Sequence, residues 1–224
     1  RILGPVWGYA ASGLFAGLVS STAATLSLST MAKKDPEIRG PVATGIVLAN
    51  VSSAAAQLVV VAIACVPLLL PTGKVLGAAA VVGLTATLGA MLMPGMHKDS
   101  AVMELESPLA LRSSLKFAGL LALVFLVASL AGTLLGDRAV LGTAVLGGTV
   151  SLHAVSLAIS TLADGGELSI SLAVLAILLG FLANMTVKLV LVAWAGGTRL
   201  FLLVAPPRLG MIGSAVACYI WLVR

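Results

Sequence analysis

The sequence predicts an all-α integral membrane protein with about seven transmembrane helices in two related halves. Hydrophobic residues make up 60% of the 224 residues and charged residues only 9%, whereas soluble domains carry about 25% charged residues. The mean hydropathy is +1.16. The apolar stretches are continuous and long enough for helices that cross the hydrocarbon core, and they lack the short alternating pattern of a membrane β-barrel.

Charged and turn-forming segments divide the chain into the predicted spans. The first break is KKDPEIRGP, and PLLLPTGK, LGDR, ADGGE and GGTR mark later ones. APPR is expected to open the last span, because proline is tolerated at a helix start. The predicted spans are residues 5–31, 42–66, 74–94, 115–135, 139–163, 169–195 and 208–223.

These spans form two membrane halves joined by a charged segment. Residues 1–94 hold three spans, residues 95–114 form the connection, and residues 115–224 hold four spans. The distribution of Lys and Arg over the short loops favours a cytoplasmic connection. The second half has an extra leading span and the chain begins with Arg. We therefore expect a further N-terminal segment. The net charge of +5 indicates membrane topology and no nucleic-acid surface.

A Ser/Thr-rich segment of the first predicted span occurs twice. At an offset of 131 positions, AGLVSSTAATLSLSTMA (16–32) lies over GGTVSLHAVSLAISTLA (147–163), with eight of seventeen pairs identical. LAN at 48–50 recurs at 182–184, an offset of 134. Four spans separate equivalent positions, which predicts a parallel repeat. An inverted repeat would require one predicted span to be re-entrant or absent.

Both copies place polar side chains along one helix face. Residues at i, i+3 and i+7 share a face, so the two stripes are Thr22, Thr25 and Ser29, and His153, Ser156 and Ser160. One interpretation is a tight packing seam, because small residues let membrane helices approach closely and hydroxyls can bond their own backbone. The other interpretation is a solute path, because the first span is long enough to break near residues 17–21 and to expose free N–H groups there.

Larger polar side chains extend these faces. Asn50 and Asn184 lie near the middle of their spans, and Gln57 follows Asn50 by two turns on the same face. Lys188 shares a face with Asn184. A charged residue within a span indicates a functional site, unless it lies near enough to the helix end to reach the interface. His153 is either a packing residue or a proton carrier.

Other chemistries are not visible in the sequence. No Asp or Glu lies within a predicted span, so we expect no carboxylate site for a cation. Hydroxyl, amide, His and Lys groups suit an anion or a neutral solute better. Nucleotide-binding, metal-binding and nucleophile–base motifs are also missing, so we expect no enzyme, cofactor or metal. Cys65 and Cys218 are interpreted as inert thiols.

Several segments resemble a known family. GLFAGLVSSTAATLSLS (13–29), ATGIVLAN (43–50), ESPLALRSSLKFAGLLALV (106–124) and LSISLAVLAILLGFLANMTVKLVLV (168–192) are similar to the C-terminal membrane domain, of unknown function, of MgtC/SapB-type proteins. The resemblance departs at VSLHAVS (150–156), where an acidic residue is common in that family. It implies a multi-pass protein of the bacterial inner membrane that acts beside an N-terminal MgtC-like domain.

The sequence thus predicts a transporter or channel for a small ion or solute. The expected partners are the lipid bilayer, that ion or solute, and further copies of the chain in a homo-oligomer. The alternative is a non-transporting regulatory or assembly subunit whose small-residue motifs are packing seams. The residues expected to line the path are Ser20, Ser21, Thr22, Thr25, Asn50, Ser151, His153, Ser156, Asn184 and Lys188.

Overall fold

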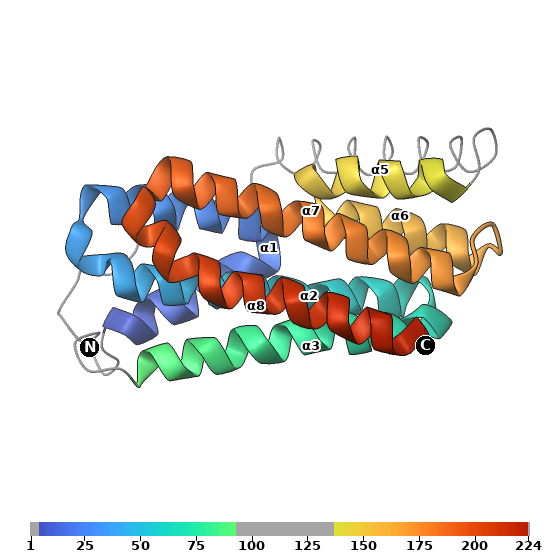
Figure 1. Ribbon diagram of the computed structural model, residues 1–224, viewed down its shortest axis with the longest axis horizontal. Helices are drawn as coiled ribbons and strands as arrows, with labels where there is room; N and C mark the ends of the chain where they lie inside the picture. The colour runs from blue at the N-terminus through green and yellow to red at the C-terminus, as the bar shows by residue number, and fades with distance from the viewer. Residues whose placement is uncertain (1–4, 93–136, 224) are drawn as a thin grey trace. The chain divides into compact units, whose positions relative to one another are not determined.

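The computed structural model describes residues 5–92 and 137–223, and these residues form helices only (Figure 1). The predicted span 115–135 and the connection 95–114 lie outside the described residues. The elements are α1 (Pro5–Lys34), the 3₁₀ turn η1 (Pro36–Ile38), α2 (Arg39–Ala64), α3 (Val66–Met91), α5 (Asp137–Val150), α6 (Leu152–Asp164), α7 (Ile170–Gly196) and α8 (Thr198–Val223).

Five of the described helices are long and apolar enough to cross a membrane. They correspond to α1, α2, α3, α7 and α8, whereas α5 and α6 are shorter apolar helices. The chain is therefore a helical membrane protein, as its composition predicts.

Two helices begin earlier than the sequence predicts. α3 starts at Val66 and contains Pro71, and α8 starts at Thr198 and contains Pro206 and Pro207. The predictions of spans at 74–94 and 208–223 took these prolines as breaks. Membrane helices tolerate interior proline, because neighbouring groups satisfy the backbone that proline frees. The breaks at GGTR and ADGGE are confirmed by Gly197 and Gly166, which have positive φ angles of 80° and 77°.

The first predicted span reverses direction at Ser20, whose φ of −160° and ψ of 94° interrupt α1. Before the break, the backbone of Gly17 lies against Ala49 of α2, and Gly13 lies one turn earlier against Gly45, so this arm runs parallel to α2. After the break, Ser21 bonds Ser53, while Leu28 lies back beside Gly45. The second arm therefore runs antiparallel, and α1 is a helical hairpin, called hairpin 1 here.

The predicted span 139–163 is divided in the same way. Ser151, with φ −151° and ψ 109°, separates α5 from α6, and the two helices lie side by side (Figure 1). Ala144 of α5 and Val155 of α6 both lie beside Gly180 of α7, although a straight helix would hold them about 16 Å apart. α5 and α6 thus form a second helical hairpin, called hairpin 2 here.

The chain packs into two compact units, each of which holds one hairpin. The first unit comprises the described parts of residues 1–55, 77–106 and 187–215, and the second those of residues 56–76, 107–186 and 216–224. α2, α3, α7 and α8 each contribute residues to both units. The predicted division into sequential halves concerns the repeat and stays a prediction.

We expect Gly148→Ala to destabilise hairpin 2 by about 1–3 kcal/mol, the usual cost of an overpacked contact. A Cβ at this position would collide with the backbone of Gly180, which cannot rotate away. Gly142 on the same helix has nothing near its Cβ position, so Gly142→Ala should be neutral or slightly stabilising. Thermal unfolding of the purified variants in detergent measures both, and equal midpoints would contradict the close packing of α5 on α7.

Candidate functional site

The tip of each hairpin is built around a serine that caps the returning helix. Breaking a helix leaves N–H groups without intrahelical partners. Ser20 Oγ accepts from the N–H of Ala23, and Ser151 Oγ accepts from the N–H of Ala154, both at 3.3 Å. Since Ser151 follows Ser20 by 131 positions (151 − 20), the two breaks fall at the offset of the sequence repeat.

A buried polar cluster surrounds the tip of hairpin 1. Lys188 Nζ donates to Ser21 Oγ at 2.7 Å and to Asn50 Oδ1 at 3.1 Å, and Ser21 Oγ donates to Ser53 Oγ at 3.0 Å. Asn50 is held in place by a bond from Nδ2 to Ile46 O at 2.8 Å. Lys188 is only 1% exposed, so it does not reach the helix end as the alternative interpretation required. We call Ser21, Asn50, Ser53 and Lys188 the lysine cluster.

The tip of hairpin 2 has amide side chains in place of the lysine cluster. Asn184 Nδ2 donates to Gly148 O at 2.9 Å, near the end of α5. Gln57 Nε2 donates to Leu152 O at 3.0 Å, at the start of α6. Gln57 and Lys188 are also 131 positions apart (188 − 57), so the residue that reaches the tip is neutral in one unit and basic in the other.

The two asparagines do not make equivalent contacts. Asn50 bonds its own helix and Lys188, whereas Asn184 bonds the arm of hairpin 2. At the offset of 131, Asn184 corresponds to Ser53 (184 − 131). The LAN match is displaced by three residues, which is close to one helical turn. The two asparagines therefore lie on similar faces of their helices but make contacts at different levels.

The predicted polar stripes lie mainly inside the two units. Thr25, Ser29, Ser156 and Ser160 are buried, while Thr22 and His153 are half-buried. Thr25 Oγ1 donates to Ser21 O at 2.7 Å, as the packing interpretation expects. In contrast, the hydroxyls of Ser29, Ser156 and Ser160 have no hydrogen-bond partner among the described residues.

Sequence reasoning missed one residue of the first unit, Arg208. The sequence places Arg208 at the very start of the last predicted span, because Pro206 and Pro207 are typical of a helix start. In the structure Arg208 lies ten positions inside α8 and is 0% exposed. The signal that was available is the apolar length of residues 198–223, which suffices for a full span.

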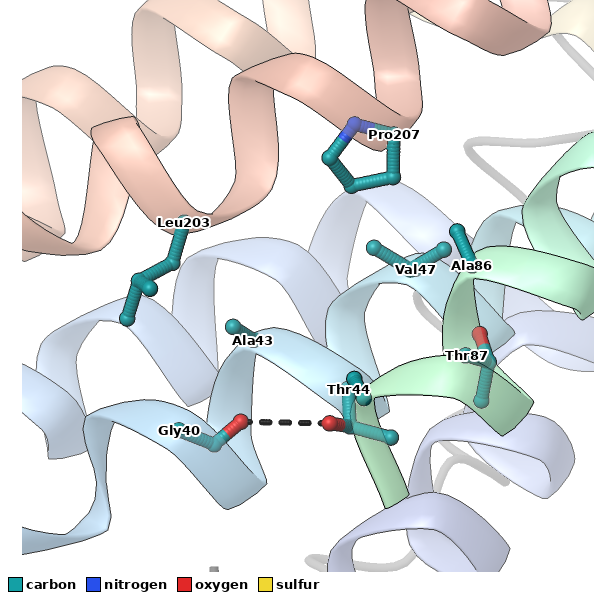
Figure 2. A pocket seen from close by; sticks show the side chains of 9 residues that line it. Gly40, Ala43, Thr44, Val47, Ala86, Thr87, Leu203 and Pro207 are labelled. Carbon is teal, nitrogen blue, oxygen red and sulfur yellow. Dashed lines mark hydrogen bonds between the residues drawn. The ribbon is translucent and has the colours of Figure 1, made fainter. Parts of the chain in front are cut away.

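The first unit also contains an apolar pocket of about 120 Å³ between α2, α3 and α8 (Figure 2). Its two hydroxyls bond their own helices, Thr44 to Gly40 O at 3.2 Å and Thr87 to Gly83 O at 2.8 Å. Neither the lysine cluster nor any residue predicted to line a path borders this pocket. The pocket is therefore suited to apolar groups and is separate from the polar tip.

A known protein family matches most of the chain. The family described as "Domain of unknown function (DUF4010)" matches residues 1–196. No curated protein and no solved structure matches the chain.

The hydrogen bonds of Lys188 predict a non-additive pair of substitutions. Asn50→Leu removes an acceptor from a buried ammonium and should cost about 2 kcal/mol of stability. Adding Lys188→Met to that variant should recover part of the loss, because the uncompensated charge disappears. Thermal unfolding in detergent measures the stability of the two single variants and the double variant. The control is Lys74→Met, at an exposed position of α3. Losses that simply add would show that the two residues do not interact.

Proposed function

We propose that this chain, which belongs to the DUF4010 family of unknown function, is a membrane transporter or channel for a small ion or solute. The observation that carries the proposal is the pair of hairpin tips with buried polar side chains. Transporters commonly bind their substrates near the middle of the bilayer, at interrupted helices. Irregular backbone is tolerated at that depth only where it is buried in protein or lines an aqueous cavity.

The length of the hairpin arms supports this interpretation. Each arm has about 13–15 residues and is therefore roughly 20 Å long, shorter than the roughly 30 Å hydrocarbon core. An arm of this length that enters the membrane ends inside it. We infer that both hairpins are re-entrant and that Ser20 and Ser151 lie within the bilayer.

The hairpins are proposed to be two copies of one repeat. Support comes from the breaks at Ser20 and Ser151 and from the close backbone approaches at Gly17 and Gly148. A re-entrant hairpin adds no membrane crossing. α2, α3 and the predicted span 115–135 then separate the two copies by three crossings. An odd number favours an inverted repeat over the parallel repeat that seven simple spans predict.

The alternative of a regulatory or assembly subunit is favoured by a different observation. Many hydroxyls bond the carbonyl of their own helix, among them Thr25, Thr30 and Thr161, and glycines line the helix contacts. These features are typical of packing seams. They do not account for the buried charge of Lys188, which packing alone does not require, and we therefore favour transport.

We base the proposed setting of the protein on the sequence resemblance. Similarity to MgtC/SapB-type proteins suggests a bacterial inner membrane and an N-terminal MgtC-like partner domain. The sequence motifs favour a role without enzymatic activity. Assembly into a homo-oligomer is part of the same proposal.

Flux through the purified chain in liposomes tests the proposal. A panel of radiolabelled inorganic ions and small metabolites should include at least one that enters faster than into empty liposomes. Asn50→Leu combined with Asn184→Leu should abolish this flux, because both hairpin tips lose their amide contacts.

The matched control is Thr30→Val with Thr161→Val, which changes two exposed hydroxyls at the same repeat positions and should preserve flux. If no solute in the panel enters, or if the folded double Asn variant transports at the rate of the unchanged chain, the proposal is wrong.

A further inference from the structure

Arg208 is the least satisfied polar side chain in the described part of the molecule. It is 0% exposed, and its Nε, Nη1 and Nη2 atoms have no hydrogen-bond partner among the described residues. A guanidinium has five N–H donors and cannot lose its charge in ordinary conditions. Burying it without a partner is strongly unfavourable. This arrangement indicates that something else satisfies the guanidinium in the working protein.

A second buried cation lies within its electrostatic reach. Ile46, Val192 and Val204 belong to one buried cluster, and Asn50, Lys188 and Arg208 each lie one helical turn beyond one of them on α2, α7 and α8. The described partners of Lys188, Ser21 and Asn50, are both neutral. The acidic side chains that the structure describes in the first unit, Asp35 and Glu37, are both exposed near helix ends. The first unit therefore buries two like charges with no buried carboxylate among the described residues to balance them.

The returning arm of hairpin 1 adds to this positive field. A helix N-terminus carries a partial positive charge and free N–H groups, and the second arm starts at Ser21, which itself binds Lys188. Ser20 Oγ caps the N–H of Ala23. Such a terminus is a common place for anions to bind, above all in interrupted membrane helices.

We propose that the first unit contains an oxyanion-binding site, in which Arg208 and Lys188 bind a small carboxylate or inorganic oxyanion at the tip of hairpin 1. The proposal rests on the proposed function, for which it names the substrate class. The planar fork of Arg208 matches two oxygens of a carboxylate, phosphate or sulfate group. Lys188 adds a point charge fixed by Asn50. Bound anion supplies the counter-charge that the described helices lack.

The residues matched to Lys188 and Arg208 explain why only one site of this kind is expected. At the tip of hairpin 2 the residue matched to Lys188 is Gln57, which donates to Leu152 O. The position matched to Arg208 at the same offset (208 − 131) is Gly77. The duplicated tips thus differ in charge, and the oxyanion is assigned to hairpin 1 alone.

Thermal unfolding of the purified chain in detergent tests the site. The probes are the sodium salts of phosphate, sulfate, acetate and succinate, each compared with sodium chloride at equal ionic strength. A ligand that binds the folded state raises the unfolding midpoint in a concentration-dependent way. At least one oxyanion should do so, and Arg208→Gln should weaken its apparent affinity by tenfold or more.

Two further variants separate binding from folding. Arg208→Gln should raise the midpoint in chloride alone, since it removes an unpaired buried charge, and Arg208→Lys should retain part of the oxyanion effect. Arg199→Gln changes an exposed arginine in the first turn of the same helix and should leave the oxyanion effect unchanged. The proposal of an oxyanion site is wrong if none of the four oxyanions stabilises the unchanged chain. It is also wrong if oxyanions raise the unfolding midpoints of Arg208→Gln and Arg199→Gln equally.

Flux measurements distinguish this inference from the proposed function. An oxyanion that stabilises the chain through Arg208 but does not enter liposomes supports the site and counts against transport. Conversely, transport of a cation or neutral solute, with no stabilisation by any of the four oxyanions, would overturn the oxyanion site and leave the transport proposal standing.

Discussion

The chain reversals at Ser20 and Ser151 are the constraint on which the rest of the structure depends. Each reversal frees backbone groups within an apolar chain, and hydrocarbon offers them no hydrogen-bond partner. The capping hydroxyls of the two serines and the amide of Asn184 on Gly148 O satisfy some of them. The glycines at 17 and 148 let the arms approach α2 and α7 closely enough for these contacts to form.

The reversal of hairpin 1 also decides where charge is placed. It brings Ser21 beside Asn50 and Ser53, which makes a buried group of oxygens that can hold the ammonium of Lys188. A neutral cluster of this kind fixes the position of a cation without cancelling its charge. With Arg208 in the same unit, the outcome is a local excess of positive charge in an apolar surrounding, where electrostatic interactions are strong.

The sequence predicts local features of this arrangement better than those that depend on distant contacts. The break near residues 17–21 and the buried polar stripes follow from the Ser/Thr pattern itself. The reversal of direction does not, because contacts with Gly45 and Ala49 determine it. The sequence pattern does not predict that Arg208 is buried, because Pro206 looks like a helix start, whereas α8 continues through it. The LAN pattern does not show that Asn50 and Asn184 make different contacts, since a shift of three residues is nearly one turn and leaves the helix face almost unchanged.

The hairpin is tested most directly by labelling the two ends of α1 and determining on which side of the membrane each end lies. Trp7→Cys and Lys34→Cys, both at exposed positions, are introduced singly into a chain whose Cys65 and Cys218 are replaced by Ala. A membrane-impermeant maleimide is then applied to right-side-out and inside-out vesicles. Because α1 is a hairpin, both cysteines should react from the same side. Reaction from opposite sides would show that α1 crosses the membrane as a single helix and would contradict the account.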